Sequence, residues 1–92
     1  MSALSAHEVA SLLDALPDWQ IEEGKLARTF IFTDFSTALA FVNRVGEQAE
    51  KAGHHPDIDI RYNQVRLGLF THDAGGLTMK DFDLAAIVDR LA

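Results

Sequence analysis

The chain has 92 residues and a formal net charge of −6, and 48% of its residues are apolar, which suits one folded domain over residues 1–92. It contains no cysteine, so disulfides, thiol nucleophiles and zinc–thiolate sites are excluded. The negative charge disfavours direct nucleic-acid binding, and because neither a signal-peptide pattern nor a stretch of roughly 20 apolar residues is present, we expect a cytoplasmic protein away from membranes.

The chain opens with the pattern of a short amphipathic helix. Ser5 and Glu8 have the spacing of a capping box, in which each side chain bonds the other residue's backbone. Apolar residues then recur at helical intervals, at Val9, Leu12, Leu13 and Leu16. Pro17 blocks continuation, so we expect a helix over residues 6–15.

Two strands and a long helix are expected next. A brief strand near residues 19–21 leads through the turn "EEG" into "KLARTFIF", whose β-branched and aromatic residues favour a second strand. Thr33 or Asp34 can cap the following helix, which has apolar residues at steps of three and four. Gly53 suits the left-handed position just after this helix.

From Asp57 the apolar residues alternate with polar ones, which predicts a β-hairpin over residues 57–62 and 65–70 with "NQ" as its turn. The pairs would be Tyr62 with Val65, Ile60 with Leu67 and Ile58 with Leu69, apolar facing apolar throughout. Extending this register places His55 opposite His72. By strict alternation His54 would point to the other face, unless Pro56 bends the entry to the strand.

The segment "HDAGGL" is expected to form a loop, in which Gly75 and Gly76 make a turn. Thr78 and Asp81 have capping-box spacing ahead of a third helix. The resulting order, α-β-β-α-β-β-α, contains hairpins rather than helical crossovers. We therefore expect an α+β fold, with a four-stranded antiparallel sheet and three helices on one face.

Three histidines are the candidate functional residues. Taken singly, His54, His55 or His72 is most simply a polar loop or sheet residue, and His7 has the pattern of a surface residue. Their expected convergence favours a shared role in general acid–base chemistry, because an unperturbed imidazole has a pKa of about 6.5 and can serve as acid or base near neutral pH. Metal binding is the rival interpretation, although no helical H-x-x-x-H pair is present.

A compound motif resembles that of the pterin-4a-carbinolamine dehydratases. It comprises a charged residue, His-His-Pro, an aromatic residue, a later histidine and a final aspartate. Here these positions are Glu50, His54, His55, Pro56, Tyr62, His72 and Asp81. The segments "THDAGGLTMKDFDLA", Asp34–Phe35 and "W…EEG" after Trp19 also fit, so the resemblance covers nearly the whole chain.

The resemblance implies dehydration of a 4a-hydroxytetrahydropterin to the quinonoid dihydropterin, in pterin recycling, with no cofactor and no metal. The implied catalytic residues are His54, His55 and His72, with Asp81 in support. Gly53, Phe70, Thr71 and Asp73 are further expected substrate contacts.

The family also implies a homodimer formed by extending the sheet across an edge, and in some members a homotetramer. Some animal members act as dimerisation cofactors of a transcription factor. A protein-binding module on the same scaffold is therefore the alternative function.

Overall fold

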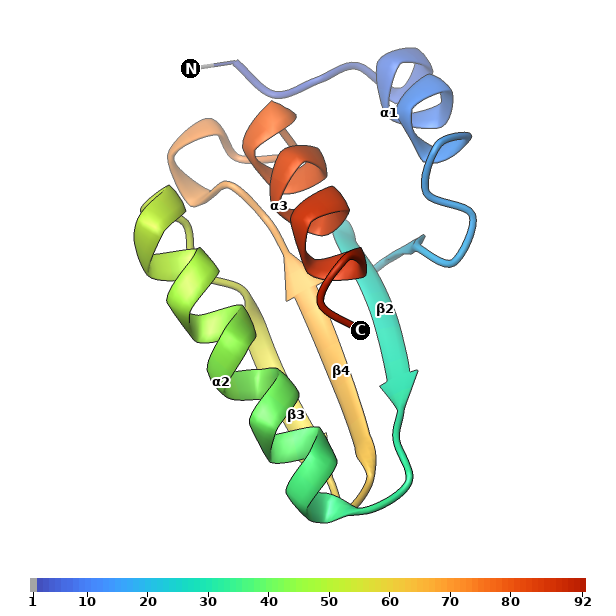
Figure 1. Ribbon diagram of the computed structural model, residues 1–92. Coiled ribbons are helices and arrows are strands. Elements are labelled where there is room, and N and C mark those ends of the chain that lie inside the picture. Colours follow the sequence, from blue (N-terminus) through green and yellow to red (C-terminus); the bar gives the residue numbers. More distant parts are fainter. Residues whose placement is uncertain (1) are drawn as a thin grey trace.

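The computed structural model describes residues 2–92 and confirms the expected α+β class and element order (Figure 1). Two helices and two strands precede the second hairpin, and a short 3₁₀ turn, η1, follows it. The elements are α1 Ala6–Leu13, β1 Gln20–Glu22, β2 Lys25–Ile31, α2 Phe35–Ala52, β3 Asp57–Arg61, β4 Gln64–Leu69, η1 His72–Ala74 and α3 Met79–Asp89.

The sheet has the strand order β1-β2-β4-β3, and every neighbouring pair is antiparallel. Helices α2 and α3 lie side by side across one face of it (Figure 1). Helix α1 has no fully buried residue, but its apolar side chains Val9, Leu12 and Leu13 pack against the same core. Strands β1 and β3 form the two free edges of the sheet.

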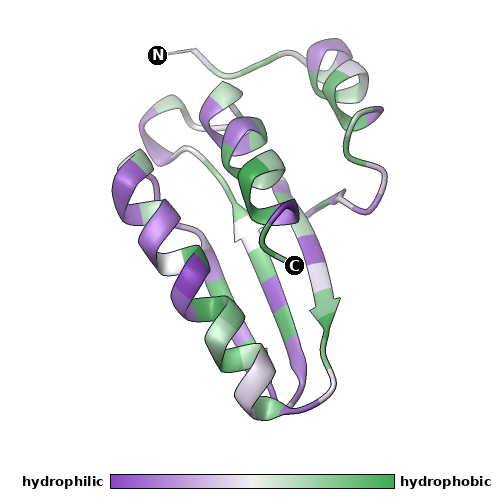
Figure 2. Cartoon of the chain, in the orientation of Figure 1, coloured by the Kyte–Doolittle hydropathy of each residue, from purple (hydrophilic) through white to green (hydrophobic). Residues whose placement is uncertain are grey.

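The core lies between the helices and the sheet. Hydrophobic and hydrophilic residues alternate along β4 in Figure 2, because successive side chains of a strand point to opposite faces. Val65, Leu67 and Leu69 of β4 are buried on the helical side, where Phe41 of α2 and Leu84 of α3 cover them. The opposite face of the sheet points away from the helices and carries polar side chains.

The helix ends follow the expected signals, with one difference in length. Both capping boxes form, and Asp34, not Thr33, caps α2 by accepting a hydrogen bond from the Thr37 amide at 2.8 Å. Helix α1 ends at Leu13 rather than at residue 15. The next amides bond carbonyls only three residues back, a tightening typical of helix ends.

The expected register of the second hairpin is wrong by two residues. The turn consists of Tyr62 and Asn63, so Ile60 pairs with Val65 and Ile58 with Leu67. The left-handed residue is Tyr62, with φ 54°, not Asn63. A shift of two keeps the same side chains on each face, so hydrophobic alternation does not distinguish the two registers.

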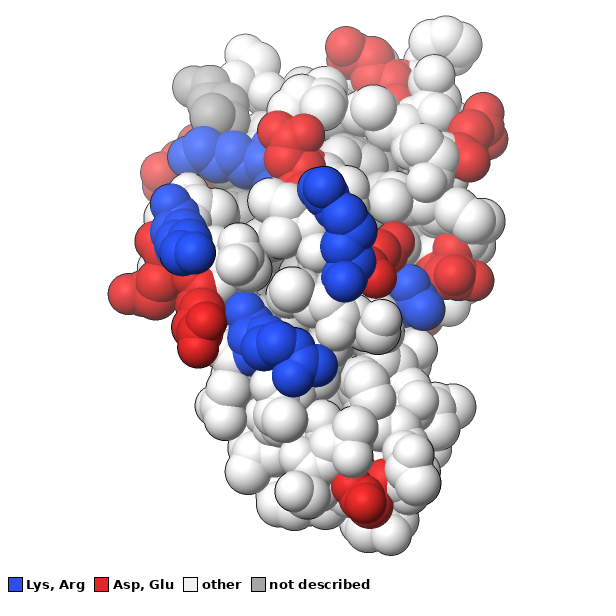
Figure 3. Space-filling view, viewed as in Figure 1, with Lys and Arg blue, Asp and Glu red and all other residues white. Residues whose placement is uncertain are grey.

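The surface is divided between a charged half and an uncharged end. Figure 3 shows acidic and basic side chains mixed over the upper part of the helical face, and few at the lower end, where α2 begins. Exposed apolar residues lie toward that end, namely Ile31, Phe35, Leu39 and Tyr62. Within residues 2–92, none of the helices combines the length and apolar character needed to cross a membrane.

Candidate active site

A hollow of about 270 Å³ lies where the end of α2, the loop after β4 and the start of α3 meet. It is lined by Gly53, His54, His55, Phe70, Thr71, His72, Asp73 and Lys80. The three histidines therefore converge on one cavity, and every expected site residue except Asp81 lines it. Asp81 lies beneath these lining residues and is fully buried.

Gly53 determines how the chain leaves α2 toward the hollow. Its φ of 63° is left-handed, a conformation that glycine adopts at little cost. The amides of Gly53 and His54 donate to the carbonyls of Glu50 and Ala49, at 3.2 and 3.1 Å, which forms a Schellman motif. This end of the helix places His54 and His55 directly after the turn.

His54 turns inward and meets a buried carboxylate. Its Nε2 lies 2.5 Å from Oδ1 of Asp81, and its side chain is only 11% exposed. Asp81 is also the first-turn acid of α3, where its Oδ2 accepts a hydrogen bond from the Thr78 amide. One carboxylate thus caps a helix and orients a histidine of the hollow.

His55 points outward and pairs with Glu50, one turn back on α2. Both side chains are mostly exposed, so this ion pair contributes little to stability. The expected pairing of His55 across from His72 is wrong, because β3 begins at Asp57 and β4 ends at Leu69. The two histidines reach the same hollow from loops instead.

His72 lies in a loop whose ends are bonded to each other. The amides and carbonyls of Thr71 and Gly76 pair at 3.2 and 3.4 Å, and η1 lies between them. The expected turn at the glycines is present, with Gly75 at φ 67°. The rings of His72 and Phe70 pack edge to face, with ring centroids 5.1 Å apart. These contacts give His72 a defined position at the mouth of the hollow.

Three residues of the site were not given these roles from the sequence. Lys80 lines the hollow, Glu50 pairs with His55, and the Thr78 hydroxyl bonds that of Thr71 at 2.8 Å. Lys80 directly precedes Asp81 at the start of a predicted helix, and that position could have indicated that Lys80 lies near the site. The Thr78 contact depends on a loop closure that has no signature in the sequence.

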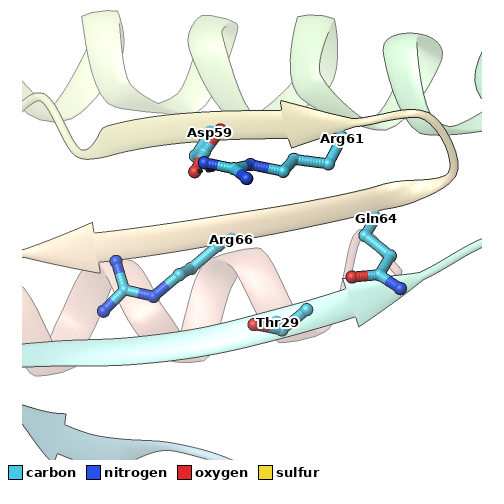
Figure 4. Close-up of a pocket in the computed structure, with 5 residues that line it drawn as sticks. All are labelled: Thr29, Asp59, Arg61, Gln64 and Arg66. Atoms are coloured by element: carbon cyan, nitrogen blue, oxygen red, sulfur yellow. Dashed lines mark ion pairs between the residues drawn. The ribbon is translucent and has the colours of Figure 1, made fainter.

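A second hollow, of about 320 Å³, lies on the uncovered face of the sheet (Figure 4). Its lining residues are Thr29, Asp59, Arg61, Gln64 and Arg66. Arg61 lies 3.4 Å from Asp59, and Arg66 lies 2.5 Å from Glu22, so both guanidinium groups have acidic partners.

No group of three His, Asp or Glu side chains in residues 2–92 has an arrangement that could hold a metal ion. The histidine hollow is therefore the candidate active site.

Comparison with known proteins finds relatives that match nearly the whole chain. The family model described as pterin 4 alpha carbinolamine dehydratase matches residues 2–91. Relatives from Acidobacterium capsulatum and Chloroflexus aurantiacus, provisionally named pterin-4-alpha-carbinolamine dehydratases, are 55% and 57% identical over 91 residues, which cover at least 98% of each chain.

Two solved structures are also similar. A transcriptional coactivator/pterin dehydratase from Brucella melitensis has a TM-score of 0.94 at 36% identity over 99% of both chains. A pterin dehydratase-like RuBisCO assembly factor of the alpha-carboxysome has a TM-score of 0.66 at 27% identity, over 80% of this chain and 86% of that one. The shared motif, the shared fold and these identities agree: the chain belongs to the pterin 4 alpha carbinolamine dehydratase family.

Proposed function

We propose that the protein dehydrates a 4a-hydroxytetrahydropterin to the quinonoid dihydropterin and water, and that it serves pterin recycling. Family membership supports the reaction class. The observation that carries the proposal is the convergence of His54, His55 and His72 on one hollow. Charged and neutral imidazoles in the same site can supply both an acid and a base near neutral pH.

The reaction requires two proton movements and no electron transfer. N5 of the pterin loses a proton, its electron pair forms the N5–C4a double bond, and the 4a-hydroxyl leaves with a proton as water. One neutral imidazole accepts the N5 proton and one imidazolium protonates the hydroxyl. We propose that His54, His55 and His72 divide these roles without a metal or cofactor.

The other lining residues suit binding of a flat, polar heterocycle. Phe70 offers an apolar surface beside His72, and Asp73 offers a carboxylate to the amino and amide groups of a pterin edge. Gly53 allows close approach of a ring to the backbone, because no side chain projects there. Lys80 adds a flexible cation to the lining. We propose Gly53, Phe70 and Asp73 as substrate contacts.

The test is the decay of freshly generated 4a-hydroxytetrahydropterin with wild type, His55→Ala and His72→Ala. Loss of a positioned acid or base lowers the rate by about 10²–10⁴. His7→Ala is the matched control, because His7 is exposed on α1 and does not line the hollow. Equal rates for wild type, His55→Ala and His72→Ala would remove the proposal.

We also propose that the protein is a homo-oligomer. The free edges β1 and β3 offer unpaired backbone groups to another sheet edge. The exposed apolar side chains Ile21 of β1 and Ile58 of β3 would gain burial at such contacts. Light scattering coupled to size-exclusion chromatography measures the mass, and a mass of about 10.1 kDa at assay concentration would contradict the proposal.

A protein-binding role on the same scaffold is the second candidate. The structural relatives include a protein described as a coactivator and one described as an assembly factor. Capture of a stable partner that is unchanged by His72→Ala, together with no pterin turnover by wild type, would favour this role over the enzyme.

A further inference from the structure

Two threonine hydroxyls and one carboxylate form a buried chain of hydrogen bonds behind the hollow. Oδ2 of Asp81 lies 2.8 Å from Oγ1 of Thr71, and Thr71 Oγ1 lies 2.8 Å from Oγ1 of Thr78. Thr71 and Thr78 are 6% and 3% exposed, and Asp81 is not exposed at all. Water has little access to hydrogen bonds at this depth, so the protein groups themselves determine which atom donates and which accepts in each bond.

The directions follow from counting donors. An ionised carboxylate only accepts, so the Thr71 hydroxyl donates to Asp81. A hydroxyl has one hydrogen, so Thr71 must accept from Thr78. The Thr78 oxygen in turn accepts from the Lys80 amide at 3.3 Å, and the Thr78 amide donates to Oδ2 of Asp81 at 2.9 Å. Oδ2 therefore accepts from two donors, which leaves Oδ1 to face His54.

The carboxylate of Asp81 determines which nitrogen of His54 carries hydrogen. Oδ1 of Asp81 accepts from Nε2, so Nε2 is protonated whether the ring is neutral or charged. Nδ1 of His54 has no hydrogen-bond partner among residues 2–92. Every buried side-chain nitrogen or oxygen among these residues has a partner, so Nδ1 is not buried. Nδ1 is therefore the ring nitrogen that remains accessible to solvent or substrate.

We propose that Thr71, supported by Thr78, is a positioning residue that holds the Asp81 carboxylate against Nε2 of His54 and thereby makes Nδ1 the proton-exchanging atom of His54. This inference rests on the proposed dehydratase function for its effect on turnover. It also reassigns Thr71, which the sequence indicated as a substrate contact. Its hydroxyl is buried and occupied by two partners, so it is not free to bind a pterin.

The first test is the tautomer of His54 in the ¹⁵N-labelled wild type without ligand. Long-range ¹H–¹⁵N correlation at about pH 8, above the usual imidazole range, distinguishes the two neutral forms. The expected result is hydrogen on Nε2 and none on Nδ1. A neutral His54 that carries its hydrogen on Nδ1 in the wild type would overturn the proposal.

The second test compares Thr71→Val with Thr71→Ser. Valine has nearly the shape of threonine but no hydroxyl, so Oδ2 loses one donor, while serine retains it. Hydrogen bonds to charged groups change equilibria by roughly 10- to 100-fold, so Thr71→Val should raise the Nδ1–H form of His54 and lower kcat by roughly that factor. KM should stay within about twofold, and Thr71→Ser should restore both readouts.

Thr29→Val is the matched control, because Thr29 is an exposed threonine on the far face of the sheet. It should leave the tautomer and kcat unchanged. Wild-type kcat and tautomer in Thr71→Val would overturn the inference while leaving the dehydratase function intact. If the wild type shows no turnover but Thr71→Val still shifts the tautomer of His54, the proposed dehydratase function is wrong and the proposed role of Thr71 stands.

Discussion

Replacing Asp81 by asparagine would place a hydrogen-bond donor, in place of an acceptor, opposite Nε2 of His54. The carboxylate accepts from three donors, which are the Thr78 amide, the Thr71 hydroxyl and Nε2 of His54. An asparagine amide has one accepting oxygen and one donating nitrogen. If the oxygen stays with Thr78 and Thr71, the amide nitrogen faces Nε2, which must then give up its hydrogen. His54 would carry hydrogen on Nδ1, the nitrogen that should exchange it with substrate.

The opposite orientation of the amide is less favourable. It would direct the NH₂ group at the buried Thr78 amide and leave that N–H without an acceptor, at a cost of about 1–3 kcal/mol. This corresponds to roughly a 5- to 150-fold preference for the first orientation. We therefore expect Asp81→Asn to hold His54 in the wrong tautomer, and kcat to fall by about 10²–10⁴, the usual contribution of a positioned acid or base.

The assay is the decay of 4a-hydroxytetrahydropterin over a range of substrate concentrations, with circular dichroism to establish that the variant is folded. KM should change little, because Asp81 does not line the hollow. A folded Asp81→Asn variant with kcat within about twofold of wild type would refute this account of His54.

The remaining predictions concern the loop of the site and the start of α2. A Cβ on Gly76 would lie 2.8 Å from the Cβ of Ala3, so Gly76→Ala should cost about 1–3 kcal/mol in free energy of unfolding, and Ala3→Gly should restore most of it in the double variant. Additive losses of melting temperature would contradict that contact. The amide of Thr37 lowers the pKa of Asp34, so the Asp34 charge stabilises the fold above its unfolded pKa, and this stabilisation is lost as pH falls through the folded value. The melting temperature of wild type should therefore decline relative to Asp34→Asn as pH falls from about 7 to about 3, whereas a constant difference would refute the assignment.

Local patterns were sufficient to predict the order of the elements. Ser5 with Glu8 and Thr78 with Asp81 each mark a helix start by side chains that bond neighbouring amides, and both capping boxes form. Gly53 marks a helix end because its left-handed conformation depends on the residue itself. Such signals act within one turn of the chain, so no knowledge of the tertiary fold is needed to interpret them.

The hairpin register depends on contacts from another strand. Asn63 accepts a hydrogen bond from the amide of Phe32, and its side-chain amide donates to the Phe32 carbonyl, both at 2.8 Å. These bonds to the end of β2 hold the turn at Tyr62 and Asn63, although tyrosine is not favoured in a left-handed conformation. The sequence near the turn does not contain this information.

The composition of the site could be predicted, but not its internal bonding. Seven of the eight expected site residues line the hollow, all but Asp81, whereas Lys80 was not expected there. The contacts of His54 with Asp81 and of Thr71 with Thr78 join segments that a backbone register alone does not align. The closed loop between Thr71 and Gly76 brings Thr78 to Thr71.

The most direct test of the central claim is a crystal structure with a bound dihydropterin. We expect the ring in the hollow between His54, His55 and His72, with its N5 and C4a edge within hydrogen-bond reach of the imidazoles. A pterin bound instead in the hollow of Arg61 and Arg66 on the far face of the sheet, with the histidines unoccupied, would contradict the account.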